Sequence, residues 1–190
     1  MIAYGSINVG IKGLTPLLMN KMNASALKPQ DSRNVAKEYV PEDEARKAAY
    51  IAEINGKQQL YIPGYAVYSM IINAAGAYKF PRRRSSLSTY LAGTIRVEPE
   101  TISLGTDKYE IDERPVVIQR ARVLKWRPKI TDWAVNFQII YNKSALPDVI
   151  IPQLKTIMED GGTRLGLLDY RPQHKGWFGT FEVVKFEVVS

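Results

Sequence analysis

The strongest pattern in the sequence is a strict alternation of apolar and polar side chains between residues 133 and 141. Every second position is apolar, namely Trp133, Val135, Phe137, Ile139 and Tyr141. Because successive side chains of a β-strand point to opposite faces, this spacing predicts a strand with one buried face. The chain must therefore fold around a sheet that packs one side against another layer.

Three other segments also predict strands. Residues 6–14 alternate through Ile7, Val9 and Ile11, and the segments 116–124 and 180–189 are rich in valine. Residues 126–129 predict a turn between 116–124 and 133–141, so we expect those two strands to form an antiparallel hairpin.

Two amphipathic helices are expected. The first begins at Pro63, ends before Pro81 and buries the side chains that recur at i, i+3, i+4 and i+7, which are Val67, Met70, Ile71 and Ala74. The second begins after Pro147 and runs through Met158, and Gly161 and Gly162 are typical of a helix carboxyl end.

The order of these six elements predicts an α+β fold. Strand, helix, strand, strand, helix, strand is the ferredoxin-like βαββαβ order, an antiparallel sheet with both helices on one face. We expect a single domain, residues 1–190, with long insertions at about 20–60 and 80–113. The first insertion should hold a helix from Pro41 to about Glu53, and then a turn at Asn55 and Gly56 before a short strand.

The residue types that are missing exclude much chemistry. The chain has no cysteine and one histidine, His174, so it can form no disulfide, no Cys/His zinc site and no thiol nucleophile. It contains no Walker loop, dinucleotide fingerprint or nucleophile elbow. We therefore expect no catalytic residue, no metal and no cofactor.

Positive charge is segregated along the chain. Lys and Arg number 26 against 19 Asp and Glu, and no acid occurs between Asn55 and Val97 or between Arg114 and Thr131. Basic side chains neutralise phosphates and flat rings stack on unpaired bases, so this pattern favours single-stranded nucleic acid as the partner. The candidate binding residues in or near these windows are Arg82, Arg83, Arg84, Arg120, Arg122, Lys125, Trp126, Arg127 and Lys129.

A glycine-rich segment, residues 161–179, adds three further candidates. Glycine lets the backbone approach a ligand closely, and exposed N–H groups beside Arg171 and Lys175 can cradle phosphates. Trp177 lies beside these basic residues and is a second candidate for stacking.

The sequence also resembles a family. Gly-Leu-Thr-Pro-Leu-Leu at 13–18, the ferredoxin-like order and Gly-Trp-Phe-Gly-Thr-Phe at 176–181 are similar to the RAMP superfamily, the repeat-associated proteins of CRISPR systems. The whole chain also resembles small proteins of phages and mobile elements. The resemblance implies a subunit that lines single-stranded RNA, as a homo-oligomer or filament, or a nuclease that cuts RNA without metal.

These observations predict a non-catalytic protein that binds single-stranded RNA or DNA. One alternative is a metal-independent endoribonuclease in which His174 deprotonates a 2′-hydroxyl. Another is a RAMP-like subunit or inhibitor that docks on a nucleic-acid-binding complex. The sequence has no signal peptide and no apolar run long enough for a membrane span, so we expect a cytoplasmic protein without a membrane partner.

Overall fold

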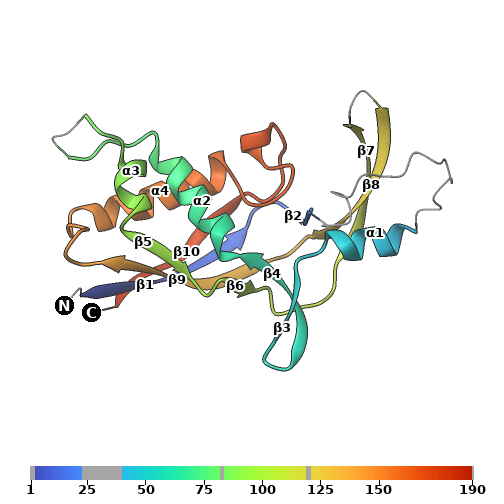
Figure 1. Cartoon of the computed structure of the whole chain (residues 1–190), viewed down its shortest axis with the longest axis horizontal. Coiled ribbons are helices and arrows are strands. Elements are labelled where there is room, and N and C mark those ends of the chain that lie inside the picture. Colours follow the sequence, from blue (N-terminus) through green and yellow to red (C-terminus); the bar gives the residue numbers. More distant parts are fainter. Residues whose placement is uncertain (1–2, 23–39, 82–83, 119–120, 190) are drawn as a thin grey trace, which may run out of the picture.

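The computed structural model describes residues 3–22, 40–81, 84–118 and 121–189 (Figure 1). Within these residues the fold is α+β, with three sheets whose neighbouring strands all pair antiparallel. None of the helices among them is long and apolar enough to cross a membrane.

The largest sheet has the strand order β10-β1-β9-β5. Strand β1 (Tyr4–Gly13) pairs with β10 (Phe181–Val189) on one side and with β9 (Ala134–Asn142) on the other. Strand β5 (Ile95–Glu98) pairs with the second side of β9. The alternation predicted for β9 is confirmed, because its buried and exposed side chains follow each other strictly from Ala134 to Gln138.

Helices α2 (Gly64–Ala75), α3 (Leu87–Ala92) and α4 (Ile150–Arg164) lie on one face of this sheet (Figure 1). The predicted apolar stripe of α2 is confirmed, because all four of its members are buried. They join one core cluster with the inward side chains of β1 and β9, and burial of each large aliphatic side chain contributes about 1.5–3 kcal/mol.

The hairpin predicted between 116–124 and 133–141 is wrong. Strand β8 (Ala121–Ile130) pairs with β7 (Glu110–Ile118) and with the short strand β2 (Leu17–Leu18), whereas β9 pairs with β1 and β5. The predicted strand 116–124 spans both arms of the β7–β8 hairpin, with Val116 opposite Val123. Adjacent valines put apolar groups on both faces of these strands, so periodicity did not show that the segment belongs to two strands.

The first insertion is only partly as predicted. Helix α1 (Pro41–Ala48) ends before Glu53 because Ala49 takes an extended conformation, and the residues after it form β3 (Ile51–Ile54). The turn at Asn55 and Gly56 is confirmed, with φ of 52° and 73°. It leads into β4 (Lys57–Pro63), which pairs with β3 and with β6 (Thr101–Ser103).

Gly161 and Gly162 do not end the last helix, which was the expectation, but lie buried inside α4. A Cβ atom at Gly161 would collide with the Met70 sulfur of α2, and one at Gly162 with the Phe181 carbonyl oxygen of β10. These glycines are therefore positions of close approach between the helix and its neighbours, and the helix continues to Arg164.

Candidate functional site

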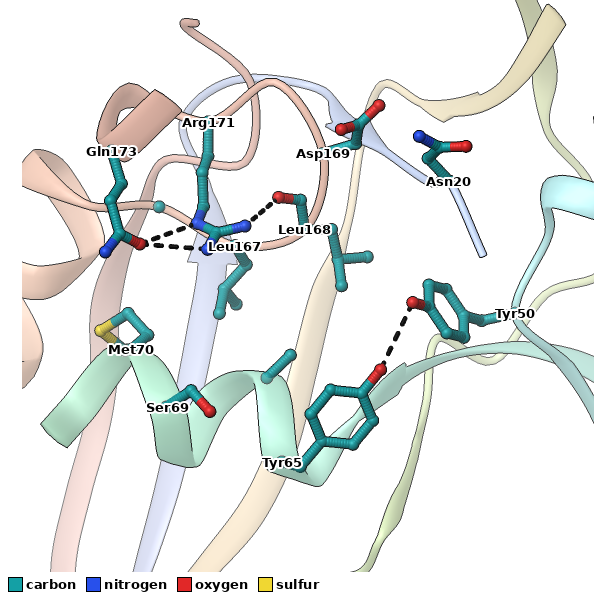
Figure 2. A pocket seen from close by; sticks show the side chains of 12 residues that line it. Asn20, Tyr50, Tyr65, Ser69, Met70, Leu167, Leu168, Asp169, Arg171 and Gln173 are labelled. Carbon is teal, nitrogen blue, oxygen red and sulfur yellow. Dashed lines mark hydrogen bonds between the residues drawn. The ribbon is translucent and has the colours of Figure 1, made fainter. Parts of the chain in front are cut away.

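A cleft of about 290 Å³ lies between α2 and the loop formed by residues 165–179. Helix α2 and this loop face each other across it, and residues from two other segments close its far side (Figure 2). The lining residues are Asn20, Tyr50, Tyr65, Ala66, Ser69, Met70, Gly166, Leu167, Leu168, Asp169, Arg171 and Gln173.

The loop 165–179 is held in an unusual backbone conformation. Leu168 and Tyr170 have φ of 60° and 49°, in the left-handed region that costs a residue other than glycine about 1–3 kcal/mol. Backbone bonds to the segment around β2 offset this cost: the Gly179 N–H donates to Pro16 O at 2.8 Å and the Asp169 N–H to Leu18 O at 3.0 Å. Strained backbone of this kind is typical of ligand sites.

Two tyrosines form one wall of the cleft. The hydroxyl oxygens of Tyr50 and Tyr65 point toward each other and lie 3.4 Å apart (Figure 2). Tyr65 is 60% exposed, so its ring is available to a ligand. Burial, more than the hydrogen bond with Tyr65, raises the pKa of the Tyr50 phenol above its ordinary value, which keeps this hydroxyl neutral at physiological pH.

Arg171 is the cation that lines the cleft. Its Nη1 donates to Leu168 O at 2.6 Å, and its Nε and Nη2 donate to Gln173 Oε1 at 3.1 and 3.0 Å (Figure 2). Partial burial lowers the pKa of the Arg171 guanidinium, while Asp169 acts in the opposite direction. The side chain still carries its charge at pH 7, because an arginine pKa starts so high.

Arg127, a predicted phosphate ligand, lies inside the protein with 5% of its surface exposed. Its Nη1 is 2.8 Å from Asp169 Oδ2, and its Nη2 is 3.4 Å from Asp112 Oδ2. Asp112 also accepts from Arg114 Nε at 2.8 Å. The charge of Arg127 is thus compensated by two carboxylates, and it ties β8 to β7 and to the wall of the cleft.

Two other candidates on β8 also have acidic partners. Lys129 Nζ lies 2.6 Å from Glu110 Oε2, and Trp126 Nε1 donates to Glu113 Oε2 at 2.8 Å. Arg122 is exposed and Lys125 half-buried on the same strand. Among the described residues, neither Arg122 nor Lys125 takes part in an ion pair.

The loop 165–179, part of which lines the cleft, also carries the candidates Lys175 and Trp177. Lys175 is exposed directly after a short 3-10 turn (Pro172–His174), with φ of 61°. Trp177 is 53% exposed and packs on Phe178, with ring centroids 4.6 Å apart. His174 is exposed in the same turn and does not line the cleft.

The arginine triplet does not join this group. Arg84 is exposed in the connection between α2 and α3, and this connection and the β7–β8 hairpin lie at opposite ends of the long axis (Figure 1). Arg82, Arg83 and Arg120 fall outside the described residues. The structure therefore brings together the loop residues and the base of the hairpin but not Arg84.

Sequence reasoning missed the tyrosine wall. Tyr65 lies on the predicted helix but outside its apolar stripe, so the pattern gave it no role. Tyr50 lies in the segment 20–60, which we expected to be an insertion. The available signal was the density of tyrosine at positions 50, 61 and 65. No family model and no curated protein matches the chain.

Proposed function

We propose that this protein binds single-stranded nucleic acid without cleaving it and holds one nucleotide in the cleft between α2 and the loop 165–179. The observation that carries this proposal is the meeting of an exposed tyrosine ring, a guanidinium and several amide and hydroxyl groups around about 290 Å³. Stacking on aromatic rings beside basic groups is the common way to hold an unpaired base.

The polarity of the cleft favours a base over a phosphate at its floor. Asn20, Ser69 and Gln173 offer donors and acceptors to a base edge, whereas the carboxylate of Asp169 repels a phosphate. The strand backbone then runs along the loop 165–179, where Lys175 is exposed and supplies positive charge. Two contacts join this loop to the hairpin, the Arg127–Asp169 ion pair and the Arg114 guanidinium 4.8 Å from the centre of the Phe178 ring.

We also propose that the largest sheet and helices α2 and α4 form a ferredoxin-like core. Along the chain its members follow the order β1, α2, β5, β9, α4, β10, which supports the split βαβ arrangement expected from the order of the predicted elements. In this arrangement β6 and the β7–β8 hairpin are inserted in the chain between the edge strand β5 and the central strand β9, and the cleft lies at the helix face.

Fluorescence anisotropy with labelled, unstructured RNA and DNA oligonucleotides tests the proposed function. Tyr65→Ala should weaken binding by about 1–3 kcal/mol, the value of one stacked base. Tyr4→Ala is the matched control, because Tyr4 is similarly exposed, at 54%, on β1, outside the cleft. It should leave the affinity unchanged.

Three results would contradict the proposal. Failure of the wild-type protein to bind any single strand rejects the function, and equal affinities of wild type and Tyr65→Ala remove the cleft from the site. Cleavage of end-labelled RNA in EDTA, lost in His174→Ala, favours the endoribonuclease instead.

A further inference from the structure

The outer edge of β10 has no partner among the described residues. The strand lies at one end of the order β10-β1-β9-β5 and pairs only with β1. It is 9 residues long and contains no proline, so its outward N–H and C=O groups can receive another strand. Val184, Val188 and Val189 on it are 59%, 49% and 41% exposed.

The sequence of this strand is symmetric about Phe186. Residues 183–189 read Val-Val-Lys-Phe-Glu-Val-Val, and reversing this order exchanges only Lys185 with Glu187. If two copies pair antiparallel with Phe186 opposite Phe186, each Lys185 lies opposite the Glu187 of the other copy. Opposite charges at directly facing positions stabilise a pair of strands, whereas like charges destabilise it. A two-fold interface requires this kind of self-complementarity.

The positions of the side chains in the sheet suit this pairing. Lys185 lies opposite Gly10 and Glu187 opposite Asn8, so both charges are on the face away from the helices. They are 45% and 62% exposed, with Nζ and Oε2 3.1 Å apart. Phe186 lies opposite Val9 and packs against the core, so two facing Phe186 rings extend the apolar layer.

A β-bulge limits the length of the pairing. The register of β10 on β1 shifts between Gly10 and Ile11, and Val184 has no opposite residue on β1. The regular part of the edge therefore begins at Lys185, and residues 185–187 lie inside it. A lysine on an edge strand normally discourages pairing with another strand. Here the charge of Lys185 is compensated when the partner is an antiparallel second copy, because the Glu187 of that copy lies opposite it.

We propose that β10 pairs antiparallel with the β10 of a second copy of this chain, centred on Phe186, and joins the two largest sheets into one. The partner is a second copy because the order of the charges complements itself. This inference is independent of the proposed function. The paired segment is short, so we expect a weak dimer that dissociates on dilution, as for small interfaces.

Sedimentation equilibrium of the full chain tests the dimer. Lys185→Glu and Glu187→Lys each place like charges opposite each other twice, and each should weaken the dimer about tenfold. The double variant Lys185→Glu/Glu187→Lys restores both attractive pairs and should dimerise like wild type. Arg96→Glu is the control: Arg96 pairs with Glu98 at 2.7 Å on β5, at the other edge of the same sheet, and its reversal should change nothing.

A cysteine cross-link reports the register. The wild-type chain has no cysteine, so Phe186→Cys introduces the sole thiol, and facing Cβ atoms about 4.5–5.5 Å apart are near disulfide range. This variant should form a disulfide dimer under mild oxidation faster than Val97→Cys on β5. The charge variants do not touch the core, so they decide the proposal if Phe186→Cys misfolds.

A protein that stays monomeric at all concentrations up to about 1 mM overturns the inference. So does a dimer that resists both single reversals, or one that the double reversal does not restore. None of these outcomes bears on Tyr65, so failure of the dimer and failure of the cleft are distinguishable.

Discussion

Arg127 illustrates how a single residue can be read wrongly from a charge pattern. It lies in a stretch without acids, yet its partners Asp112 and Asp169 are 15 and 42 residues away. A count of charges along the sequence includes only residues that are close in the chain. An ion pair forms between residues that are close in the folded structure. Arg171 and Lys175, by contrast, lie on the predicted glycine-rich loop, because glycine content does report local backbone geometry.

Arg127→Met should lower the free energy of unfolding by about 3 kcal/mol, because it removes one of the two cations that compensate the buried charge of Asp112 among the described residues, where Asp112 is 8% exposed. Urea denaturation monitored by circular dichroism measures the change. Arg122→Met on the same strand is the control, and as an exposed site it should stay within about 0.5 kcal/mol of wild type. Equal stabilities of the two variants would show that the buried ion pairs contribute nothing net.

At the scale of elements, periodicity predicted α2 and β9 but not which strands pair. A strand with one buried face has an apolar residue at every second position, so it can be recognised from the sequence. The sequence pattern does not indicate which strand lies beside it in the sheet. Strand β5, which pairs with β9 in the largest sheet, is four residues long and lies within the segment 80–113 that we expected to be an insertion. Residues 116–124 looked like a better strand and belong to the hairpin instead.

Helix propensity alone predicts that replacing a glycine of α4 by alanine stabilises the protein, but the packing of α4 on β10 predicts the opposite at Gly162. Alanine favours a helix over glycine by about 1 kcal/mol, but a Cβ at Gly162 meets the Phe181 carbonyl oxygen. Gly162→Ala should therefore lower the unfolding free energy by about 1–3 kcal/mol. Gly161→Ala should cost less, because the Met70 side chain it meets is flexible.

Thermal and urea unfolding compare these variants. Thr163→Ala, an exposed neighbour in the same helix, serves as control and should change stability by less than about 0.5 kcal/mol. A Gly162→Ala protein more stable than wild type would mean that α4 can move away from β10 at little cost.

At the scale of the whole molecule, the sequence predicted one continuous basic face. Among the described residues, the basic side chains lie in separate parts of the molecule instead. Arg171 and Lys175 lie on the loop beside the cleft, and Arg122 and Lys125 lie on the hairpin that contacts this loop. Arg84 belongs to the connection between α2 and α3, which lies at the opposite end of the long axis from the hairpin (Figure 1). Basic residues from distant segments lie on one face only if the chain path brings those segments together. The local sequence pattern does not specify this path.

This division predicts the salt dependence of binding. If Arg122, Lys125, Arg171 and Lys175 each neutralise a phosphate, log K falls with log salt with a slope of about −2.8, so a fourfold rise in salt weakens binding about 50-fold. Arg122→Ala/Lys125→Ala should reduce the slope by about 1.4. Arg84→Ala should leave it unchanged. A slope that falls equally in Arg84→Ala would place the nucleic acid across the whole molecule instead.

The carboxylate of Asp169 belongs to the wall of the cleft and also holds Arg127, which fastens the hairpin. Asp169 Oδ2 accepts from Arg127 at 2.8 Å, and the carboxylate as a whole carries one negative charge. A ligand whose N–H groups bound Asp169 from the cleft would share this charge with the Arg127 guanidinium and weaken the ion pair, so occupancy of the cleft would be coupled to the attachment of the hairpin.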